Sequence, residues 1–310
     1  MRTKLKKYLL GLLFVPCTVF AWNMNGHVMI TDMAQTKLSN KLKANINVLA
    51  QGIFIQLSAK DQRFLIRRFP NMPAIARLSV LPDWWKQEPL GMLFKRFHAP
   101  LPQLLKPYAK ETTASWHFIN HPYPAKRQCD IIKPENVVWA INLLQKAYQS
   151  TDNANTKGLI LIFLAHFVGD AHQPLHTLSY VNARCQSDYG GNAFCLTKKK
   201  HGRCRYNLHE YWDSTMGEFK GYPHIGAWEG IIKQASNPNL VALNQQAKDL
   251  NPAGWARHNK AYAAFIYSAQ KYHLPSKAYK QKAQKIAYSE MRLASLRLAK
   301  VLRGLVAKAK

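Results

Sequence analysis

Apolar residues recur every three or four positions along most of the chain, which is the spacing of one face of an α-helix. This pattern predicts helices over residues 26–38, 135–148, 157–171 and 208–216. A longer helix is predicted over 276–306, where Ala, Ile, Leu and Val follow one stripe and basic residues the other. Because alternating strand patterns are scarce, we expect an all-α fold, a single-domain helical bundle with long loops.

The segment 157–171 differs from the other predicted helices because it is apolar nearly all round. Such a helix is typical of the centre of a bundle, and Pro174 is expected to end it. Between the helices, a proline-rich segment over 70–107 and a glycine-rich segment over 187–205 are predicted to be loops.

The first 21 residues have the pattern of a secretory signal peptide. A basic head is followed by a short apolar run, and Val19-Phe20-Ala21 resembles a cleavage site. The run is too short to span a bilayer, and no later stretch is long and apolar enough. We therefore expect a secreted or periplasmic protein without stable membrane insertion, a monomer that begins at Trp22 after processing.

The charge of the chain points to an anionic partner. Lys and Arg number 44 against 16 Asp and Glu, a formal net charge of +28. Removal of the predicted signal peptide takes away four basic residues and no acidic ones, which leaves +24. Such an excess attracts nucleic acid or an anionic membrane surface. A basic charge that serves only solubility is the alternative interpretation.

Four cysteines follow the predicted cleavage site, Cys129, Cys185, Cys195 and Cys204. An even number in an exported chain favours two disulfides, and the sequence leaves all three pairings open. A zinc site built from these cysteines is disfavoured because no Cys-x-x-Cys pair is present.

Two His-x-x-x-Asp pairs carry the strongest chemical signal. His166 and Asp170 lie four residues apart on one face of the apolar helix, and His209 and Asp213 repeat the spacing. A buried carboxylate beside an imidazole is costly unless the two are paired or bind a metal. One such pair is usually a satisfied core interaction, but two in an acid-poor chain favour a metal, and zinc suits these ligands.

These pairs belong to a larger set of motifs that resembles the S1/P1 nuclease family, whose helical fold is shared with zinc-dependent phospholipase C. The resemblance covers the whole expected mature chain, in order. Its motifs are Trp-Asn-Met-Asn-Gly-His over 22–27, Asp83 before two Trp, Trp-His-Phe-Ile-Asn over 116–120, the segment 166–176, Gly-Gly-Asn over 190–192, Asn-Leu-His-Glu-Tyr-Trp-Asp over 207–213, and Met-Arg-Leu-Ala over 291–294.

The resemblance implies three zinc ions. The first is held by the amine and carbonyl of Trp22, by His27 and by Asp170. The second is held by Asp83, His117, His166 and the same Asp170, which bridges the two, and the third by His176, His209 and Asp213. His172 has no ligand role. Asp83 is the least securely aligned position, with Asp61 as the fallback.

The resemblance also implies a reaction, the hydrolysis of single-stranded DNA and RNA to 5′-phosphate products. The nucleophile is a metal-bound water that bridges the paired zincs, so no side-chain nucleophile is required. Asn192, Trp84, Trp85 and Tyr189 are candidate substrate-binding residues, since aromatic side chains stack on unpaired bases. Core packing is the alternative role for the three aromatic residues.

Two other functions remain open. A zinc phospholipase C shares the fold and much of the metal set, although that family more often has Glu where Asp213 stands. A non-enzymatic polyanion-binding protein would rely on charge alone. The segment 90–110 contains the basic-aromatic stretch Leu-Phe-Lys-Arg-Phe, which is expected either to contact nucleic acid or membrane or to form a solvated loop.

Overall fold

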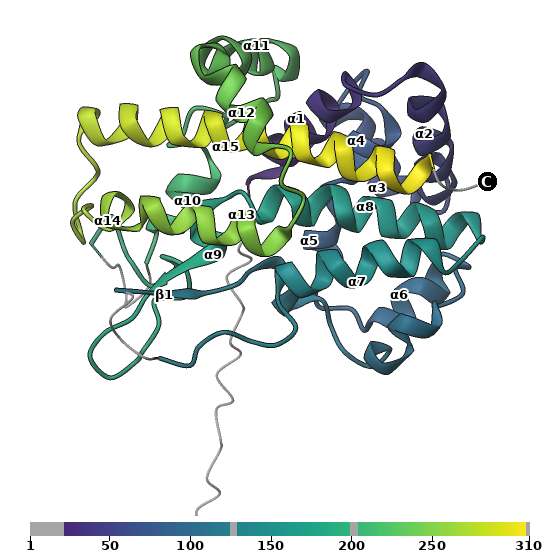
Figure 1. Ribbon diagram of the computed structural model, residues 1–310, viewed down its shortest axis with the longest axis horizontal. Coiled ribbons are helices and arrows are strands. Elements are labelled where there is room, and N and C mark those ends of the chain that lie inside the picture. Colours follow the sequence, from purple (N-terminus) through teal and green to yellow (C-terminus); the bar gives the residue numbers. More distant parts are fainter. Residues whose placement is uncertain (1–21, 125–128, 199–203, 308–310) are drawn as a thin grey trace, which may run out of the picture.

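The computed structural model describes residues 22–124, 129–198 and 204–307, and the predicted signal peptide lies outside them. Helices make up most of the described chain, and its one sheet has two short strands, so the all-α prediction is confirmed (Figure 1). The elements are, in order, α1 (Met24–Gln35), α2 (Asn40–Phe54), α3 (Ala59–Arg68), α4 (Ala74–Leu78), α5 (Leu81–Trp85), α6 (Leu90–Arg96), η1 (Gln103–Tyr108), η2 (Ala114–His117), β1 (His121–Tyr123), α7 (Val137–Gln149), α8 (Ala154–Asp170), α9 (Pro174–Thr177), β2 (Leu178–Tyr180), α10 (Leu208–Asp213), α11 (Ile225–Ser236), η3 (Asn237–Asn239), α12 (Leu240–Gln246), α13 (Pro252–His258), η4 (Asn259–Tyr262), α14 (Ala263–Ile266) and α15 (Lys277–Val306).

Helix α8 is the centre of the bundle, as its apolar sequence predicts. Every residue from Gly158 to Asp170 is buried. The Asn153 side chain caps its start by accepting a hydrogen bond from the backbone N–H of Thr156. Helices α1, α2, α7 and α15 pack around it (Figure 1). The candidate ligands His166 and Asp170 therefore stand on the most enclosed element of the fold.

Glycine at position 158 allows α8 to approach α2 closely. A Cβ atom there would lie 2.5 Å from the Leu49 carbonyl oxygen and 3.0 Å from Ile53 Cγ1. Gly158→Ala is therefore expected to lower the free energy of unfolding by about 1–3 kcal/mol, because the helices must separate. Denaturant unfolding measures this change. Gly226→Ala on α11, where the added Cβ meets nothing within 4 Å, is the control.

The long C-terminal helix has the predicted bounds. Ser276 caps α15 by accepting a hydrogen bond from the Tyr279 N–H. The helix runs across the molecule against α1, α8 and α11, as the yellow ribbon of Figure 1 shows. Its buried stripe includes Met291, Leu298 and Leu302, so it contributes to the core along much of its length.

Two predictions about prolines were wrong. The segment 70–107 is not a loop but contains α4, α5, α6 and η1, because its prolines stand at helix starts or between short helices. Pro174 does not end the central helix, which stops at Asp170; it occupies the first turn of α9 instead. Leu93 and Phe94 of α6 and Phe97, its C-cap residue, are fully buried, so both aromatic rings belong to the core.

A small parallel sheet and two disulfides hold the loops next to the candidate ligands. Strand β1 pairs with β2 in the register His121 to Leu178, shortly after His117 and His176 respectively. Cys129 is bonded to Cys185, and Cys195 to Cys204. Of the three possible pairings, this one ties the segment before α7 to the segment after β2 and closes a short loop within the glycine-rich segment.

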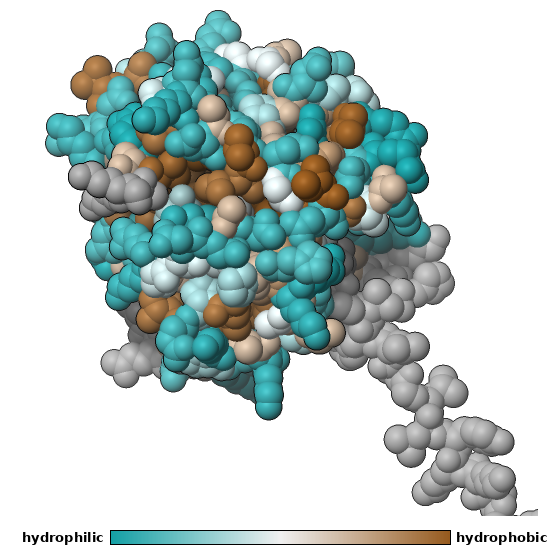
Figure 2. Space-filling view, turned by 90° about the vertical axis from the view of Figure 1, so that its right-hand side faces the viewer, coloured by the Kyte–Doolittle hydropathy of each residue, from teal (hydrophilic) through white to brown (hydrophobic). Residues whose placement is uncertain are grey.

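The molecular surface is mainly hydrophilic on the face that Figure 2 shows, with apolar residues in separate patches. None of the helices in the described ranges combines the length and apolarity that a bilayer span requires.

Candidate metal centre

Buried histidine and aspartate side chains gather in three groups that could each hold a metal ion. The groups are His27, His166 and Asp170; Asp83, His117 and His166; and His176, His209 and Asp213. Within each group the potential ligand atoms lie within 4.8 Å of one another. All eight predicted His and Asp ligands are therefore brought together, although they come from six separate elements.

Asp170 lies between the first two groups. Its Oδ1 is 3.4 Å from His27 Nε2, whereas its Oδ2 is 3.1 Å from His117 Nδ1 and 3.3 Å from His166 Nε2. Each carboxylate oxygen therefore faces a different set of imidazoles. This geometry suits a carboxylate that bridges two cations.

His27 reaches this position because α1 crosses α8 at a glycine. A Cβ atom on Gly169 would lie 3.0 Å from His27 Nδ1, so any larger residue would push the imidazole away. The imidazole stacks on that of His166, with ring centroids 3.8 Å apart. Asn23 caps α1 by accepting from the Gly26 N–H, which fixes the first turn that carries His27.

Asp83 lies in the site and Asp61 does not. The short helix α5 places Asp83 Oδ1 3.8 Å from His117 Nδ1 and its Oδ2 3.8 Å from His166 Nε2. Asp61 is in the first turn of α3, where its Oδ2 accepts a hydrogen bond from the Ser58 hydroxyl. Of the two aspartates, the structure therefore places Asp83 among the candidate metal ligands.

Backbone carbonyls fix the tautomers of three histidines. Nδ1 of His166 donates to the Ser79 carbonyl at 2.8 Å, that of His176 to the His117 carbonyl at 2.7 Å, and that of His209 to the Gly190 carbonyl at 2.6 Å. Because a carbonyl oxygen can only accept, each Nδ1 carries the proton. In a neutral ring the Nε2 lone pair then points into the site, which is the usual orientation of a metal-binding histidine.

The third group shows most directly that these side chains fit a cation. His176 Nε2 and His209 Nε2 lie 3.1 Å apart, and Asp213 Oδ2 is 3.4 Å from His209 Nε2. Two lone pairs at this distance repel unless a positive charge lies between them. A zinc ion held by these three side chains would have one ligand fewer than a structural zinc site, as in catalytic zinc sites.

Unpartnered polar atoms support the same interpretation for the first two groups. Both ring nitrogens of His27, Nε2 of His117 and Oδ1 of Asp170 are buried without a hydrogen-bond partner within the described residues. Buried polar atoms are nearly always satisfied, and a cation would satisfy those that face it.

Burial shifts the ionisation of the whole site toward neutral imidazoles. It lowers the pKa of His166 and His176 well below the usual value and that of His209 to about 4. Burial, followed by the charges of Asp83 and Asp213, raises the pKa of Asp170 well above its usual value. Neutral imidazoles keep their lone pairs, and these carboxylates are costly to ionise unless a cation is near.

Trp22 lies at the edge of the site, held from two sides. Its fully buried indole donates to the Gly169 carbonyl at 3.0 Å, one residue before Asp170. The next backbone N–H, that of Asn23, donates to the Asp213 carbonyl at 3.0 Å. The backbone of Trp22 is therefore fixed between α8 and α10, the helices that carry Asp170 and Asp213.

Three further residues support the candidate ligands in ways that the sequence does not predict. Gln173 donates to Asp213 Oδ1, and its own oxygen accepts from the Leu175 N–H. Gly190 has φ +63 and lies so close to the Leu175 carbonyl that no side chain fits, which places its carbonyl on His209. Lys86 Nζ is 3.2 Å from Asp83 Oδ1 and brings a cation to the rim. Gly190 and Gln173 lie within motifs of the sequence, but those motifs do not show these contacts.

His172 lies outside the three groups, as expected. Its Nδ1 donates to the Val168 carbonyl at 2.7 Å, and Arg297 Nη1 donates to its Nε2 at 2.8 Å. Both nitrogens are thus occupied, and the residue joins α15 to the loop after α8.

The four candidate substrate-binding residues have different surroundings. Trp85 is buried against Phe97 and Phe163, so it is a core residue. Trp84 is 36% exposed and Tyr189 is 69% exposed, and either ring could stack on a base. Asn192 is half-buried, and its Nδ2 donates to the Tyr189 carbonyl.

The chain is similar to a known protein family and to several curated proteins. The family described as S1/P1 Nuclease matches residues 22–307. Among curated proteins of Arabidopsis thaliana, Endonuclease 2 is 28% identical over 221 residues, which are 67% of this chain and 60% of that protein. Endonuclease 5 is 34% identical over 118 residues, 34% of this chain and 37% of that protein. The chain thus spans about 60% or less of the length of these relatives.

Proposed function

Since this chain belongs to the S1/P1 nuclease family, which matches it from Trp22 to the last turn of α15, we propose that it is a zinc-dependent nuclease that cleaves single-stranded DNA and RNA to 5′-phosphate products. The observation that carries the proposal is Asp170, whose two oxygens face two different sets of imidazoles. The family and the endonuclease relatives support nucleic acid as the substrate, and so does the net charge of +28.

Three zinc ions would be held by Trp22, His27 and Asp170; by Asp83, His117, His166 and Asp170; and by His176, His209 and Asp213. When bound, the zincs would lower the pKa of a water that attacks phosphorus and would stabilise the charge that develops on the phosphate oxygens. The protein's own part is orientation. The carbonyls of Ser79, His117 and Gly190 keep the Nδ1 protons of three imidazoles away from the site.

Positive charge and aromatic surface at the rim support a single-stranded substrate. Lys86, 13% exposed and beside Asp83, is placed to attract a phosphate. The exposed rings of Trp84 and Tyr189 offer stacking surfaces, which are accessible only to unpaired bases. A duplex keeps its bases stacked and cannot use them.

We also propose that residues 22–310 act as one nuclease domain, in a monomer exported after removal of residues 1–21. One large hydrophobic core that includes residues from Trp22 to Val306 supports a single domain. The two disulfides support export, because they persist in oxidising compartments.

Removal of metal is expected to abolish the activity. The purified protein should degrade single-stranded DNA and RNA oligonucleotides, and a zinc chelator should reduce the rate below detection, because no side chain in the site replaces the cation chemistry. Added zinc should restore the rate. Gel analysis of labelled oligonucleotides, together with a metal count, measures both.

Phosphatidylcholine vesicles in the same assay separate the nuclease from a phospholipase C. Hydrolysis of lipid without cleavage of oligonucleotides would refute the proposal. Oligonucleotide binding without hydrolysis, in a zinc-loaded sample, would instead favour a polyanion-binding protein.

A further inference from the structure

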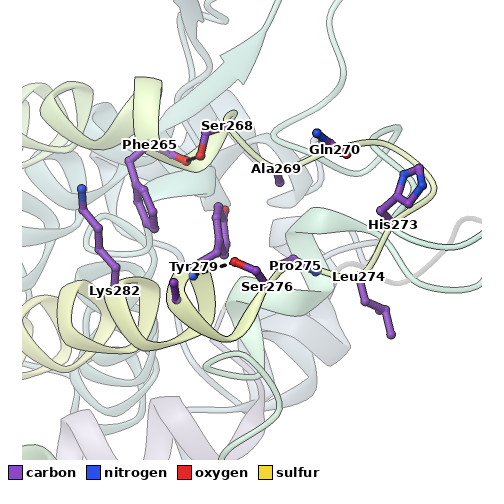
Figure 3. Close-up of a pocket in the computed structure, with 11 residues that line it drawn as sticks. Phe265, Ser268, Ala269, Gln270, His273, Leu274, Pro275, Ser276, Tyr279 and Lys282 are labelled. Atoms are coloured by element: carbon purple, nitrogen blue, oxygen red, sulfur yellow. Dashed lines mark hydrogen bonds between the residues drawn. The ribbon is translucent and has the colours of Figure 1, made fainter.

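A cavity of about 630 Å³ lies at the end of the bundle formed by α14, the segment 267–276 and the first turns of α15 (Figure 3). None of the residues that line it is a candidate metal ligand or a candidate substrate-binding residue. The cavity is thus separate from the site described above, and its size is that of a small-molecule binding pocket.

Flat apolar side chains form its walls. Phe265 from α14 and Tyr279 from α15 point toward each other in Figure 3, with ring centroids 4.7 Å apart and planes 25° apart. Ala269, Leu274 and Pro275 complete the apolar surface. Tyr279 is held rigidly, because its hydroxyl donates to the Ile266 carbonyl and accepts from Trp212 Nε1. The Phe265 ring lies between Tyr279 and Lys282 in Figure 3, so Ala269, Leu274 and Pro275 are the apolar side chains left for a ligand to contact.

Positive charge surrounds the opening. Lys282 Nζ lies 4.6 Å from the centroid of the Phe265 ring, and the side chain is exposed. No acidic residue lines the cavity, and the exposed Lys271 and Lys277 flank it. A cation at the mouth of an apolar pocket favours a ligand that joins a flat ring to an anion.

We propose that this cavity is an accessory nucleotide-binding pocket, which holds one base and its phosphate from the strand that the metal centre cleaves. The base would lie against the apolar walls, with Gln270 beside it, and the phosphate would contact Lys282. This inference rests on the proposed nuclease function.

Helix α10 joins the pocket to the metal centre. Trp212 bonds to Tyr279 beneath the pocket and packs on Phe265, with ring centroids 6.4 Å apart. The next residue, Asp213, belongs to the third metal group. One short helix thus contributes a residue to each site. On this proposal, we expect a long strand to contact both sites and a dinucleotide to contact only one.

Substrate length therefore tests the pocket. With the zinc-loaded protein, Lys282→Gln is expected to raise KM for a single-stranded 20-mer about three- to fivefold and to leave a dinucleotide substrate unchanged. The slope of log(kcat/KM) against log salt should fall in magnitude by about 0.7, the value for one lost phosphate contact on a single strand. Lys285→Gln removes an exposed lysine of α15 that does not line the cavity, and it is the matched control.

A second variant, Ala269→Trp, fills the cavity without changing charge and should also raise KM for the 20-mer alone. The pocket is refuted if Lys282→Gln behaves as Lys285→Gln does, or if dinucleotide cleavage falls as much as 20-mer cleavage. If the wild-type protein cleaves no oligonucleotide, the proposed function fails. Binding of the intact 20-mer to the same variants then decides the pocket separately.

Discussion

Asp170→Asn is expected to reduce nuclease activity roughly 10³-fold or more and to release two metal ions together. The carboxylate faces His27 with one oxygen and His117 and His166 with the other. The amide keeps the shape but presents an NH₂ group to one side and has no negative charge, so neither cation would be held well. Elemental analysis of the purified variant and an oligonucleotide assay measure the two effects.

The matched control is Asp61→Asn, at the acidic residue that the sequence motifs leave as an alternative to Asp83. Asp61 lies in the first turn of α3 beside Ser58, so its variant should keep all metal ions and full activity. Retention of three zincs by Asp170→Asn would exclude a bridging role for this carboxylate.

An extra alanine before Trp22 is expected to have an effect of similar size. The α-amine has a pKa of about 7.7–8 and can bind a metal when it is free, whereas a peptide nitrogen cannot. Trp22 cannot move aside to make room, because its indole is bonded to Gly169 and the next N–H to Asp213. The nuclease rate and the metal content of the extended protein test this.

The control for this experiment is the same alanine added at the C-terminus. Full activity and three zincs in the N-terminally extended protein would remove the amine from the ligand set, while leaving His27 and Asp170 as candidates.

Helix periodicity and residue spacing predicted the elements that carry regular patterns. The bounds of α15 were predicted to the residue because a cap and a long amphipathic stripe coincide there. Short helices were missed where prolines interrupt the pattern, as in α4 to α6, because five to seven residues hold too little periodicity. Whether such a short segment forms a helix depends on its tertiary packing.

The candidate ligands could be proposed from motifs, but their mutual arrangement could not. No spacing in the sequence says that Asp170 turns one oxygen to His27 and the other to His117. The hydrogen-bond acceptors of the His166 and His209 imidazoles could not be predicted either, because Ser79 and Gly190 accept through their backbone carbonyls and not through side chains. Gln173 lies within the motif 166–176, but its role could not be predicted, because its contact with Asp213 spans 40 residues and depends on the turn before α9.

The way in which Trp22 is held has a consequence for the cell that makes this protein. If residues 1–21 are removed as proposed, the uncleaved chain has a peptide bond where the proposed ligand amine belongs, and the last candidate ligand, Asp213, lies 191 residues after Trp22. A chain still being synthesised, or still attached to its leader, would therefore be latent. On this proposal, nuclease activity would arise only after the chain is synthesised as far as Asp213 and residues 1–21 are removed.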